Sequence, residues 1–381
     1  MSLFKLAAPL FVAGLAFAAS SASAQEQVVK IGHVGPITGS IAHMGKDNEN
    51  GARMAIEDLN AKGIILAGKK IRFQLQAEDD AGDPKQGTAA ATKLVDAKVS
   101  AVIGHLNSGT TIPASKIYAD AGIPQVSPSA TNPRYTLQGF KTAFRVVAND
   151  SQLGNVLGQY AVKTMGAKTV AVIDDRTAYG QGVAEEFAKG VKAAGGTIIS
   201  NQYTTDKATD FSAILTAIKA RKPDVIFFGG IDAVGGPMLR QMKQLGLTAK
   251  FMGGDGICTG TLPSLAGGGL ADDLVVCAEA GGTPDSEKKA MDDFRDAYKK
   301  RFGIDIVYNA GYAYDATMVV VAAMQKADSW EPAKYLPELA KIDYKGVTGN
   351  IAFDEHGDLR DGFLTLYTYK GDKRTQIAVV K

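Results

Sequence analysis

The sequence predicts an α/β protein made of two doubly wound lobes, each built on a parallel sheet. Short β-branched runs alternate with amphipathic helical stretches along most of the chain. Several strands read as continuous apolar runs, which is typical of parallel sheets covered by helices on both faces. With 381 residues, the chain is also long enough for two domains of roughly 150 residues each.

A first set of alternating elements precedes residue 150. The helix expected at 51–62 carries apolar residues at i, i+3, i+4 and i+7, and Gly63 ends it. Asp83 and Pro84 offer an N-cap and a first-turn proline to the next helix. The expected strands are 28–34, 71–76, 101–104, 125–127 and 143–147, and the other expected helices are 84–95 and 110–121.

A second set begins near residue 151 and repeats the same rhythm. Its expected helices are 153–165, 182–194 and 211–220, and its expected strands are 170–173, 197–199 and 225–228. Three further helices are expected after the second set, at 286–302, 313–326 and 332–342. They are more than the second lobe alone would need at its end. The tail predicts a β-hairpin, with strands 363–369 and 375–380 around the turn 370–373.

Composition excludes several classes of protein. Apolar residues make up 45% and charged residues 22%, which is ordinary for a globular protein and unlike a disordered chain. Forty-two Lys and Arg against 40 Asp and Glu give a net charge of +2, so the chain has no large excess of positive charge to attract nucleic acid. A nucleic-acid partner is therefore not expected.

The N-terminus reads as a secretory signal. Lys5 precedes an apolar run over 6–19, and Ala22-Ser-Ala24 forms a small-residue cleavage site before Gln25. About 14 apolar residues fall short of the roughly 20 that cross a bilayer as a helix. Since no cysteine lies near the cleavage point, lipid tethering is not expected. The sequence predicts residues 1–24 as a signal peptide cleaved after about Ala24, and a protein free in the periplasm.

The chain has two cysteines, Cys258 and Cys277. In an oxidising compartment they can pair, and closing so short a loop would stabilise the fold by roughly 3 kcal/mol. We expect a structural disulfide, and the alternative is two buried thiols.

Catalytic signatures are absent. No G-x-S-x-G places a serine on a strand-to-helix elbow, and the four histidines lack metal-binding spacing. The segment 104–109 imitates a phosphate loop but has no lysine to reach a nucleotide. The sequence therefore predicts neither an enzyme, nor a cofactor, nor a metal site. His105, which ends a strand, reads as a hydrogen-bonded structural residue.

Hydroxyl groups gather just after two strands of the first set. Ser108-Gly-Thr-Thr111 opens a helix, so its N–H groups and hydroxyls would meet a carboxylate at the positive end of the helix dipole. Ser127-Pro-Ser-Ala-Thr131 follows the next strand, and ligands of parallel sheets sit at the carboxyl ends of strands. The alternative for each segment is ordinary helix capping.

The second set offers complementary groups at its own strand ends. Asp255 follows the strand at 251–252 and could hold an ammonium ion, while Tyr179 offers a hydroxyl and a flat apolar face. A ligand with both a carboxylate and an ammonium group would then bridge the two lobes. The alternative for Asp255 is a turn residue before Gly256.

Six collinear segments carry a resemblance to a known family. The sequence resembles the periplasmic leucine/isoleucine/valine-binding proteins of ABC transporters over almost the whole mature chain, in segments 79–86, 102–108, 128–131, 179–182, 251–256 and 353–358. The resemblance implies a type I periplasmic binding fold with two lobes joined by a three-crossing hinge. It implies a first lobe of 27–147 and 279–347 and a second lobe of 148–278 and 348–381.

The resemblance also implies roles for particular residues. Ser108 and Thr131 would bind the ligand carboxylate, the backbone at Ser129 and the acid at Asp255 would bind the ammonium, and Tyr179 would be the second-lobe contact.

Three positions depart from the family pattern. Asp255 resembles a shortened Glu, Met44 stands where an aromatic side chain often lines the apolar pocket, and Ile231 stands where a Tyr is expected. The α-amino-acid anchor is therefore kept while the side-chain pocket is altered. Some members carry a disulfide in the first lobe, but Gly82 and Asn107 fill those positions here.

The expected function is that of a soluble, monomeric periplasmic receptor. It would close on a small branched-chain or aliphatic amino acid and deliver it to an inner-membrane ABC permease. One alternative is the same scaffold with an aromatic amino acid, an ω-amino acid or an amide as ligand. Another is a secreted α/β hydrolase whose site is assembled from dispersed residues such as Ser108 and His105.

Overall fold

The computed structural model describes residues 26–283 and 288–381. The predicted signal peptide and its cleavage site lie outside the described residues. Within the described part of the chain, no helix is both long and apolar enough to cross a membrane.

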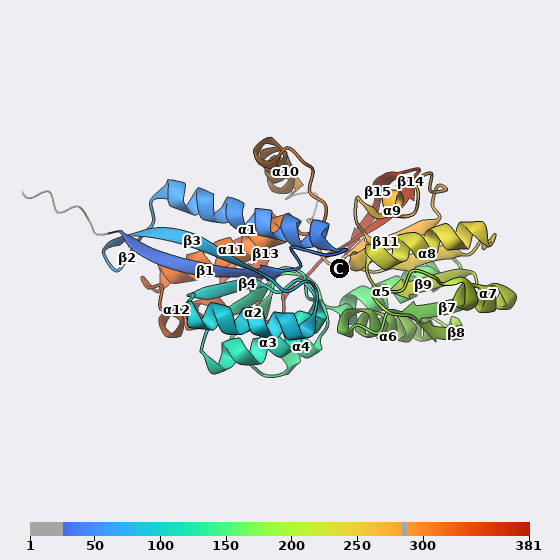
Figure 1. Ribbon diagram of the computed structural model, residues 1–381, viewed down its shortest axis with the longest axis horizontal. Coiled ribbons are helices and arrows are strands. Elements are labelled where there is room, and N and C mark those ends of the chain that lie inside the picture. The colour runs from blue at the N-terminus through green and yellow to red at the C-terminus, as the bar shows by residue number, and fades with distance from the viewer. Residues whose placement is uncertain (1–25, 284–287) are drawn as a thin grey trace, which may run out of the picture.

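The first sheet has six strands in the order β2-β3-β1-β4-β5-β6. All neighbours are parallel except the short pair β2 and β3. Helices α1 and α11 pack together over one face, and α2 and α3 pack together over the other (Figure 1). The strands are β1 (Gln27–Gly35), β2 (Ile65–Leu66), β3 (Lys69–Asp79), β4 (Ala101–Gly104), β5 (Gln125–Ser127) and β6 (Ala143–Arg145). The helices are α1 (Ala42–Lys62), α2 (Pro84–Asp96), α3 (Ser108–Asp120), α4 (Arg134–Leu137), α10 (Lys288–Phe302), α11 (Ala310–Lys326) and α12 (Pro332–Ala340).

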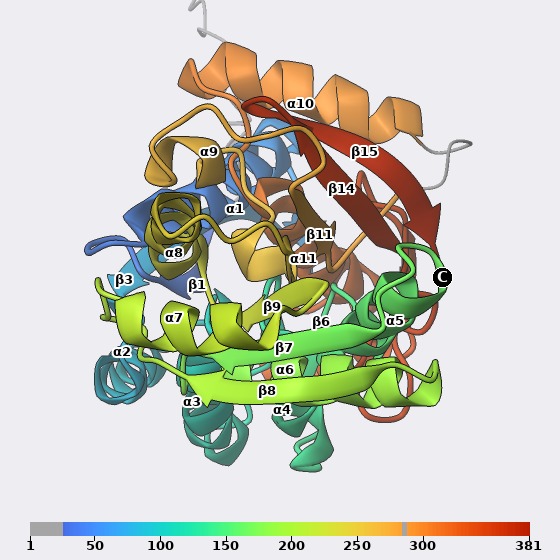
Figure 2. The same cartoon turned by 90° about the vertical axis from the view of Figure 1, so that its right-hand side faces the viewer.

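The second sheet has seven strands in the order β15-β14-β11-β10-β9-β7-β8 (Figure 2). Five are parallel, and the hairpin β14–β15 adds two antiparallel strands at one edge. The strands are β7 (Thr169–Asp174), β8 (Thr197–Tyr203), β9 (Val225–Gly229), β10 (Lys250–Gly253), β11 (Val275–Glu279), β14 (Leu364–Lys370) and β15 (Lys373–Val380). The helices are α5 (Asp150–Lys163), α6 (Ala178–Ala193), α7 (Ser212–Arg221), α8 (Asp232–Gln244), α9 (Leu262–Leu265) and the 3-10 turn η1 (Asp255–Ile257).

The chain passes between the two sheets three times. It leaves the first sheet after β6, returns to it after β11, and leaves it again after the small antiparallel pair β12 (Asp343–Lys345) and β13 (Asn350–Ala352). The predicted fold class of two doubly wound lobes with a three-crossing hinge is confirmed. The central strands β4 and β9 are buried along their whole length, as their apolar sequences predict.

The expected disulfide and C-terminal hairpin are both present. Cys258 and Cys277 are bonded, with their Cα atoms 5.4 Å apart, so the alternative of two free thiols is wrong. Strand β14 pairs with β15 around the turn 370–373. Asp83 also caps α2 as predicted, because its side chain accepts a hydrogen bond from the Gln86 N–H at 2.9 Å.

Two of the helices that differ from the sequence expectation contain glycine at close contacts. Helix α1 begins at Ala42, nine residues before the expected start. A Cβ atom at Gly45 would lie 2.2 Å from the Pro36 carbonyl oxygen, and one at Gly51 would lie 2.0 Å from that of Ala310. Helix α8, which was not expected, contains a Gly-Gly-Pro run over 235–237. Glycine and proline lower helix propensity, so the sequence pattern hides helices that tertiary packing stabilises.

Candidate functional site: a cavity between the two lobes

A small cavity of about 20 Å³ lies where the carboxyl ends of the two sheets face each other. Its walls come from both lobes, and six of the seven binding residues predicted from sequence contribute to it. The wall residues from the first lobe are Met44, Leu106, Asn107, Ser108, Ser129 and Tyr308, and those from the second lobe are Tyr179, Ile231, Asp255 and Gly256. Thr131 is the predicted residue that does not line the cavity.

The first turn of helix α3 forms one wall. Ser108 stands at the opening of this helix, as the sequence predicts, although the helix begins two residues before the expected start at 110, and the extended backbone of Asn107 precedes it. The Ser108 hydroxyl oxygen accepts a hydrogen bond from the Asn132 N–H at 3.2 Å. The wall therefore combines a hydroxyl group with the positive end of a 13-residue helix, which favours an anionic group.

The loop after β5 forms the adjacent wall. Asn48 donates a hydrogen bond to the Ser129 hydroxyl at 2.7 Å, which fixes the loop against helix α1. The Thr131 hydroxyl is fully buried and makes no hydrogen bond of 3.5 Å or less among the described residues, although it lies close enough to the buried Asp150 carboxyl to counteract the rise in that group's pKa that burial causes. An unpaired buried hydroxyl is costly, so Thr131 is a group with unused hydrogen-bonding capacity close to the cavity.

A buried arginine holds this loop in place. Arg145 donates hydrogen bonds to the carbonyl oxygens of Ala130, at 2.7 Å, and Asn132, at 3.0 Å. Its Nε lies 2.6 Å from Oδ1 of Asp358, which belongs to the third crossing between the lobes. The sequence does not single out Arg145, because a single Arg at a strand end has no recognisable spacing.

Asp255 is the one acidic side chain in the cavity wall. Its Oδ1 accepts a hydrogen bond from the Tyr179 hydroxyl at 2.8 Å, and its Oδ2 accepts one from the Tyr308 hydroxyl at 2.6 Å. Burial raises the pKa of Asp255 to about 6, although the two tyrosine hydroxyls act in the opposite direction. The Tyr179 oxygen in turn accepts the Gly256 N–H at 2.9 Å. Asp255 is thus a buried carboxylate held in a defined orientation.

Tyr308 is a site residue that sequence reasoning missed. Its loop is held by Asp47 of helix α1, whose carboxylate accepts the N–H groups of Val307, Tyr308 and Ala310 at 2.8 to 3.1 Å. Helix α11 begins at Ala310, three residues before the expected start. Only a correct helix start would have placed Tyr308 at an element end, where binding residues gather.

A second contact joins the lobes beside the cavity. His43 Nε2 lies 3.0 Å from Oδ2 of Asp232, at the start of helix α8. The same oxygen accepts the hydroxyls of Thr259 and Thr261, at 2.6 and 2.7 Å. Burial opposes protonation of His43, but the Asp232 carboxylate outweighs it and raises the pKa of the imidazole.

The structure does not assemble a Ser108–His105 pair. His105 is fully buried, with Nδ1 3.0 Å from Asp80 and Nε2 3.0 Å from the Tyr118 hydroxyl. Both ring nitrogens are therefore occupied by other partners, as the structural interpretation of His105 predicts. Among residues 26–283 and 288–381, no group of three or more His, Cys, Asp or Glu side chains could hold a metal ion.

Two lobes that enclose hydroxyls, a helix N-terminus, a carboxylate and apolar side chains define a two-lobed ligand-binding protein. The sequence matches the family described as periplasmic binding protein over residues 28–372. The chain belongs to this family.

Three similar proteins illustrate the match. A leucine-, isoleucine-, valine-, threonine- and alanine-binding protein of Pseudomonas aeruginosa is 34% identical over 376 residues, 98% of each chain. A leucine-specific-binding protein of Salmonella typhimurium is 33% identical over 374 residues, 98% of this chain and 100% of that one. The structure of a branched-chain amino acid transporter substrate binding protein from Streptococcus pneumoniae, in complex with isoleucine, superposes with a TM-score of 0.84 at 27% identity, covering 93% of this chain and 99% of that one.

Proposed function

We propose that this protein is a periplasmic receptor that binds an aliphatic α-amino acid between its lobes and delivers it to an ABC permease. The observation that carries the proposal is the pairing, in one inter-lobe cavity, of an anion-binding helix end at Ser108 with a buried carboxylate at Asp255. These groups match the two charged ends of an amino acid. The ligands named for the similar proteins belong to the same class and support the proposal.

The carboxylate end of the ligand would meet the first lobe. Ser108 offers its hydroxyl at the start of α3, and Thr131 offers a buried hydroxyl that makes no hydrogen bond of 3.5 Å or less among the described residues. Neither group carries a charge, so a carboxylate here would be held by oriented dipoles.

The ammonium end would meet Asp255 and the backbone at Ser129. Because Asp255 comes from the second lobe and Ser129 from the first, binding would hold the lobes together. A simple carboxylic acid without an ammonium group would leave the Asp255 carboxylate buried without a counter-charge, which disfavours such ligands.

The apolar end would meet Met44 and Ile231, with Tyr179 as the second-lobe contact. Burying an aliphatic side chain contributes roughly 25 cal/mol per Å² of apolar surface. The cavity of about 20 Å³ holds about one water molecule, so entry of an amino acid requires the lobes to move apart.

The proposal also covers the bounds of the lobes, the export of the protein and its monomeric state. We place the first lobe at 27–147 and 279–347 and the second at 148–278 and 348–381, with a signal peptide cleaved after about Ala24. The protein would act as a monomer and would bind without catalysing a reaction. No catalytic pair involving Ser108 and His105 supports the hydrolase alternative.

Calorimetry on the refolded, ligand-stripped protein tests the proposal. The panel is Leu, Ile, Val, Ala, Phe and γ-aminobutyrate, and the expected result is a Kd of about 1 μM or tighter for aliphatic members. Ser108→Ala should weaken binding, whereas Ser264→Ala, on the exposed side of α9, should leave it unchanged. Tight binding only of Phe or γ-aminobutyrate would reject the aliphatic ligand, and no binding across the panel would reject the receptor function.

A further inference from the structure

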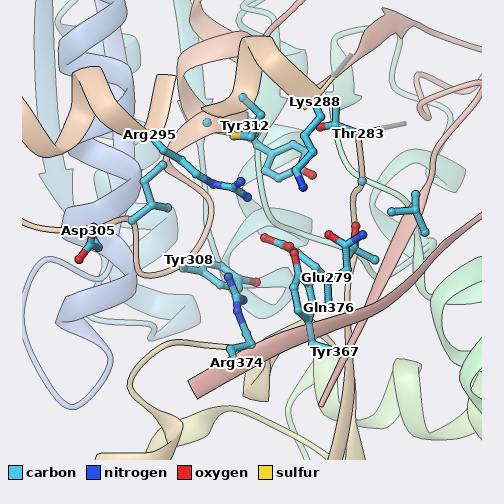
Figure 3. Close-up of a pocket in the computed structure, with 16 residues that line it drawn as sticks. Glu279, Thr283, Lys288, Arg295, Asp305, Tyr308, Tyr312, Tyr367, Arg374 and Gln376 are labelled. Atoms are coloured by element: carbon cyan, nitrogen blue, oxygen red, sulfur yellow. The ribbon is translucent and has the colours of Figure 1, made fainter. Parts of the chain in front are cut away.

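A second and larger cavity lies on the other side of Tyr308 from the inter-lobe site. It measures about 150 Å³ and is walled by helix α10 and the loop before α11 on one side, and by β11, β14 and β15 on the other (Figure 3). An engineered cavity of about this size binds benzene, so the space suffices for a small organic molecule. None of the binding residues predicted from sequence lines it.

Four charged side chains of this cavity face its interior, whereas the fifth, Asp305, lies apart from them and pairs with Lys299 at 3.0 Å. Figure 3 shows the guanidinium groups of Arg295 and Arg374 turned toward the space in front of the Glu279 carboxylate, with the Lys288 amine above it. Arg295 lies on helix α10 of the first lobe, whereas Arg374 and Glu279 lie on strands β15 and β11 of the second sheet. The cavity therefore places two guanidinium groups from opposite lobes around one space.

Arg374 is fixed in position yet retains free donors. It donates a hydrogen bond to the Cys258 carbonyl oxygen, and its guanidinium lies 4.5 Å from the centre of the Tyr367 ring. Arg374 has no ion pair within 4.0 Å among the described residues, and although burial acts to lower the pKa of its guanidinium, the nearby Glu279 carboxylate raises it. A guanidinium has five N–H donors in a planar fork, so a held Arg374 can present paired donors to a carboxylate.

Arg295 is also available to a ligand, because its own ion pair is exposed and weak. Its one ion pair among the described residues is with Asp292, one turn away on α10, at 3.0 Å, and both side chains are about half exposed. Exposed pairs of this kind contribute little, so a ligand carboxylate can compete for the guanidinium. Tyr312 and Tyr367 supply flat walls beside the two arginines.

We propose that this cavity is a second binding site, for a small organic carboxylate held between Arg374 and Arg295. Arginine favours carboxylates because its planar fork matches their two oxygens. Two kinds of carboxylate fit the wall chemistry. One is a dicarboxylate, whose second anionic group would face the Lys288 amine, and the other is an acidic amino acid, whose ammonium group would face Glu279. Because the walls come from both lobes, the occupant would bridge them.

Calorimetry with succinate and with glutamate tests the site. We expect saturable binding of at least one probe, with a Kd of about 1 mM or tighter. Arg374→Met and Arg295→Met should each weaken that binding at least tenfold. Arg301→Met is the matched control, because Arg301 lies on the same helix but contacts Asp58 of α1 and should leave binding unchanged.

Glu279→Gln separates the two kinds of ligand. Loss of this carboxylate should strengthen succinate binding, because it removes a like charge, and should weaken glutamate binding, because it removes the partner of the ammonium group. Arg295→Met changes an exposed position and so tests the site even where Arg374→Met impairs folding. Absence of binding by both probes, or binding that survives Arg295→Met unchanged, would overturn the proposal.

Discussion

The Tyr308 hydroxyl donates a hydrogen bond to Oδ2 of Asp255 at 2.6 Å, and the two residues belong to opposite lobes. Tyr179, from the same lobe as Asp255, donates to the other carboxylate oxygen at 2.8 Å. The carboxylate is thus held from both sides of the cleft. An incoming ammonium group would share Asp255 with these hydroxyls or displace the one from the first lobe.

Asp255→Ala should weaken amino-acid binding by about 2 to 5 kcal/mol, because the ligand ammonium would be buried without its counter-charge. Calorimetry at pH 7.5 measures the loss. Asp273→Ala, at a half-exposed loop position of the same lobe, is the matched control. An Asp255→Ala protein that bound as tightly as the parent would show that Asp255 is only a turn residue.

Asp255→Asn should stabilise the ligand-free protein at pH 7. Burial raises the pKa of Asp255 from 3.8 to about 6, so the native state binds more protons than the unfolded state between these values and stability falls as the pH rises through this window. Removing the ionisable group should therefore raise the free energy of unfolding by about 1 to 3 kcal/mol at pH 7, and by much less at pH 4. Urea unfolding at both pH values tests this, and an equal effect at both would contradict it.

The contact between His43 and Asp232 should make closure depend on pH. The pKa of His43 is raised in the closed arrangement, so the contribution of the pair is complete below pH 6.5 and is lost as the pH rises through the higher, closed-state value. His43 is partly exposed, so the effect on ligand affinity should be about two- to fivefold. The ratio of wild-type to His43→Gln affinity should be larger at pH 6 than at pH 8.5. His356→Gln, at an exposed histidine, serves as control, and a ratio independent of pH would argue against the pair.

Arg145→Met should destabilise the protein by about 3 to 5 kcal/mol, because it leaves Asp358 without its buried partner and frees two loop carbonyls. Arg72→Met removes an exposed arginine that lies 3.6 Å from Glu26, and it should change stability by less than about 1 kcal/mol. Urea unfolding compares the two variants. Similar small losses for both would mean that Arg145 does not support the loop.

Replacing both Cys258 and Cys277 by serine should lower the free energy of unfolding by about 3 kcal/mol, since the bond closes a short loop with a sequence separation of 19 residues. Reducing agent should destabilise the parent by a comparable amount and leave the double variant unchanged. If reducing agent left the free energy of unfolding of the parent protein unchanged, this expectation would be contradicted.

Periodicity predicted most of the fold from the sequence. The alternation of apolar strands and amphipathic helices indicated both lobes, and the excess of late helices is explained by α10, α11 and α12 returning to the first lobe. Helix α8 and the first turns of α1 were not predictable, because their glycines oppose helix formation locally. These glycines are favoured by close contacts with other segments of the folded chain, which no helical pattern records.

The candidate site was predictable where residues sit at strand ends. Ser108, Ser129 and Asp255 lie in the loops and turns that follow β4, β5 and β10, and all three line the cavity. Tyr308 and Asp232 precede or begin helices, and their partners lie far away in the sequence. Such cross-lobe pairs depend on how the lobes meet, which composition and spacing do not encode.

The contact of Gly51 with the Ala310 carbonyl has a consequence for biogenesis. It lies where helix α1 packs on helix α11, so a helix from the beginning of the chain shares its apolar surface with one from the last quarter. During synthesis from the N-terminus, α1 and the sheet face beneath it would stay without the covering helix α11 until residues 310–326 are made. During that interval the incomplete lobe exposes apolar surface and is prone to aggregate. Binding by a chaperone would protect it.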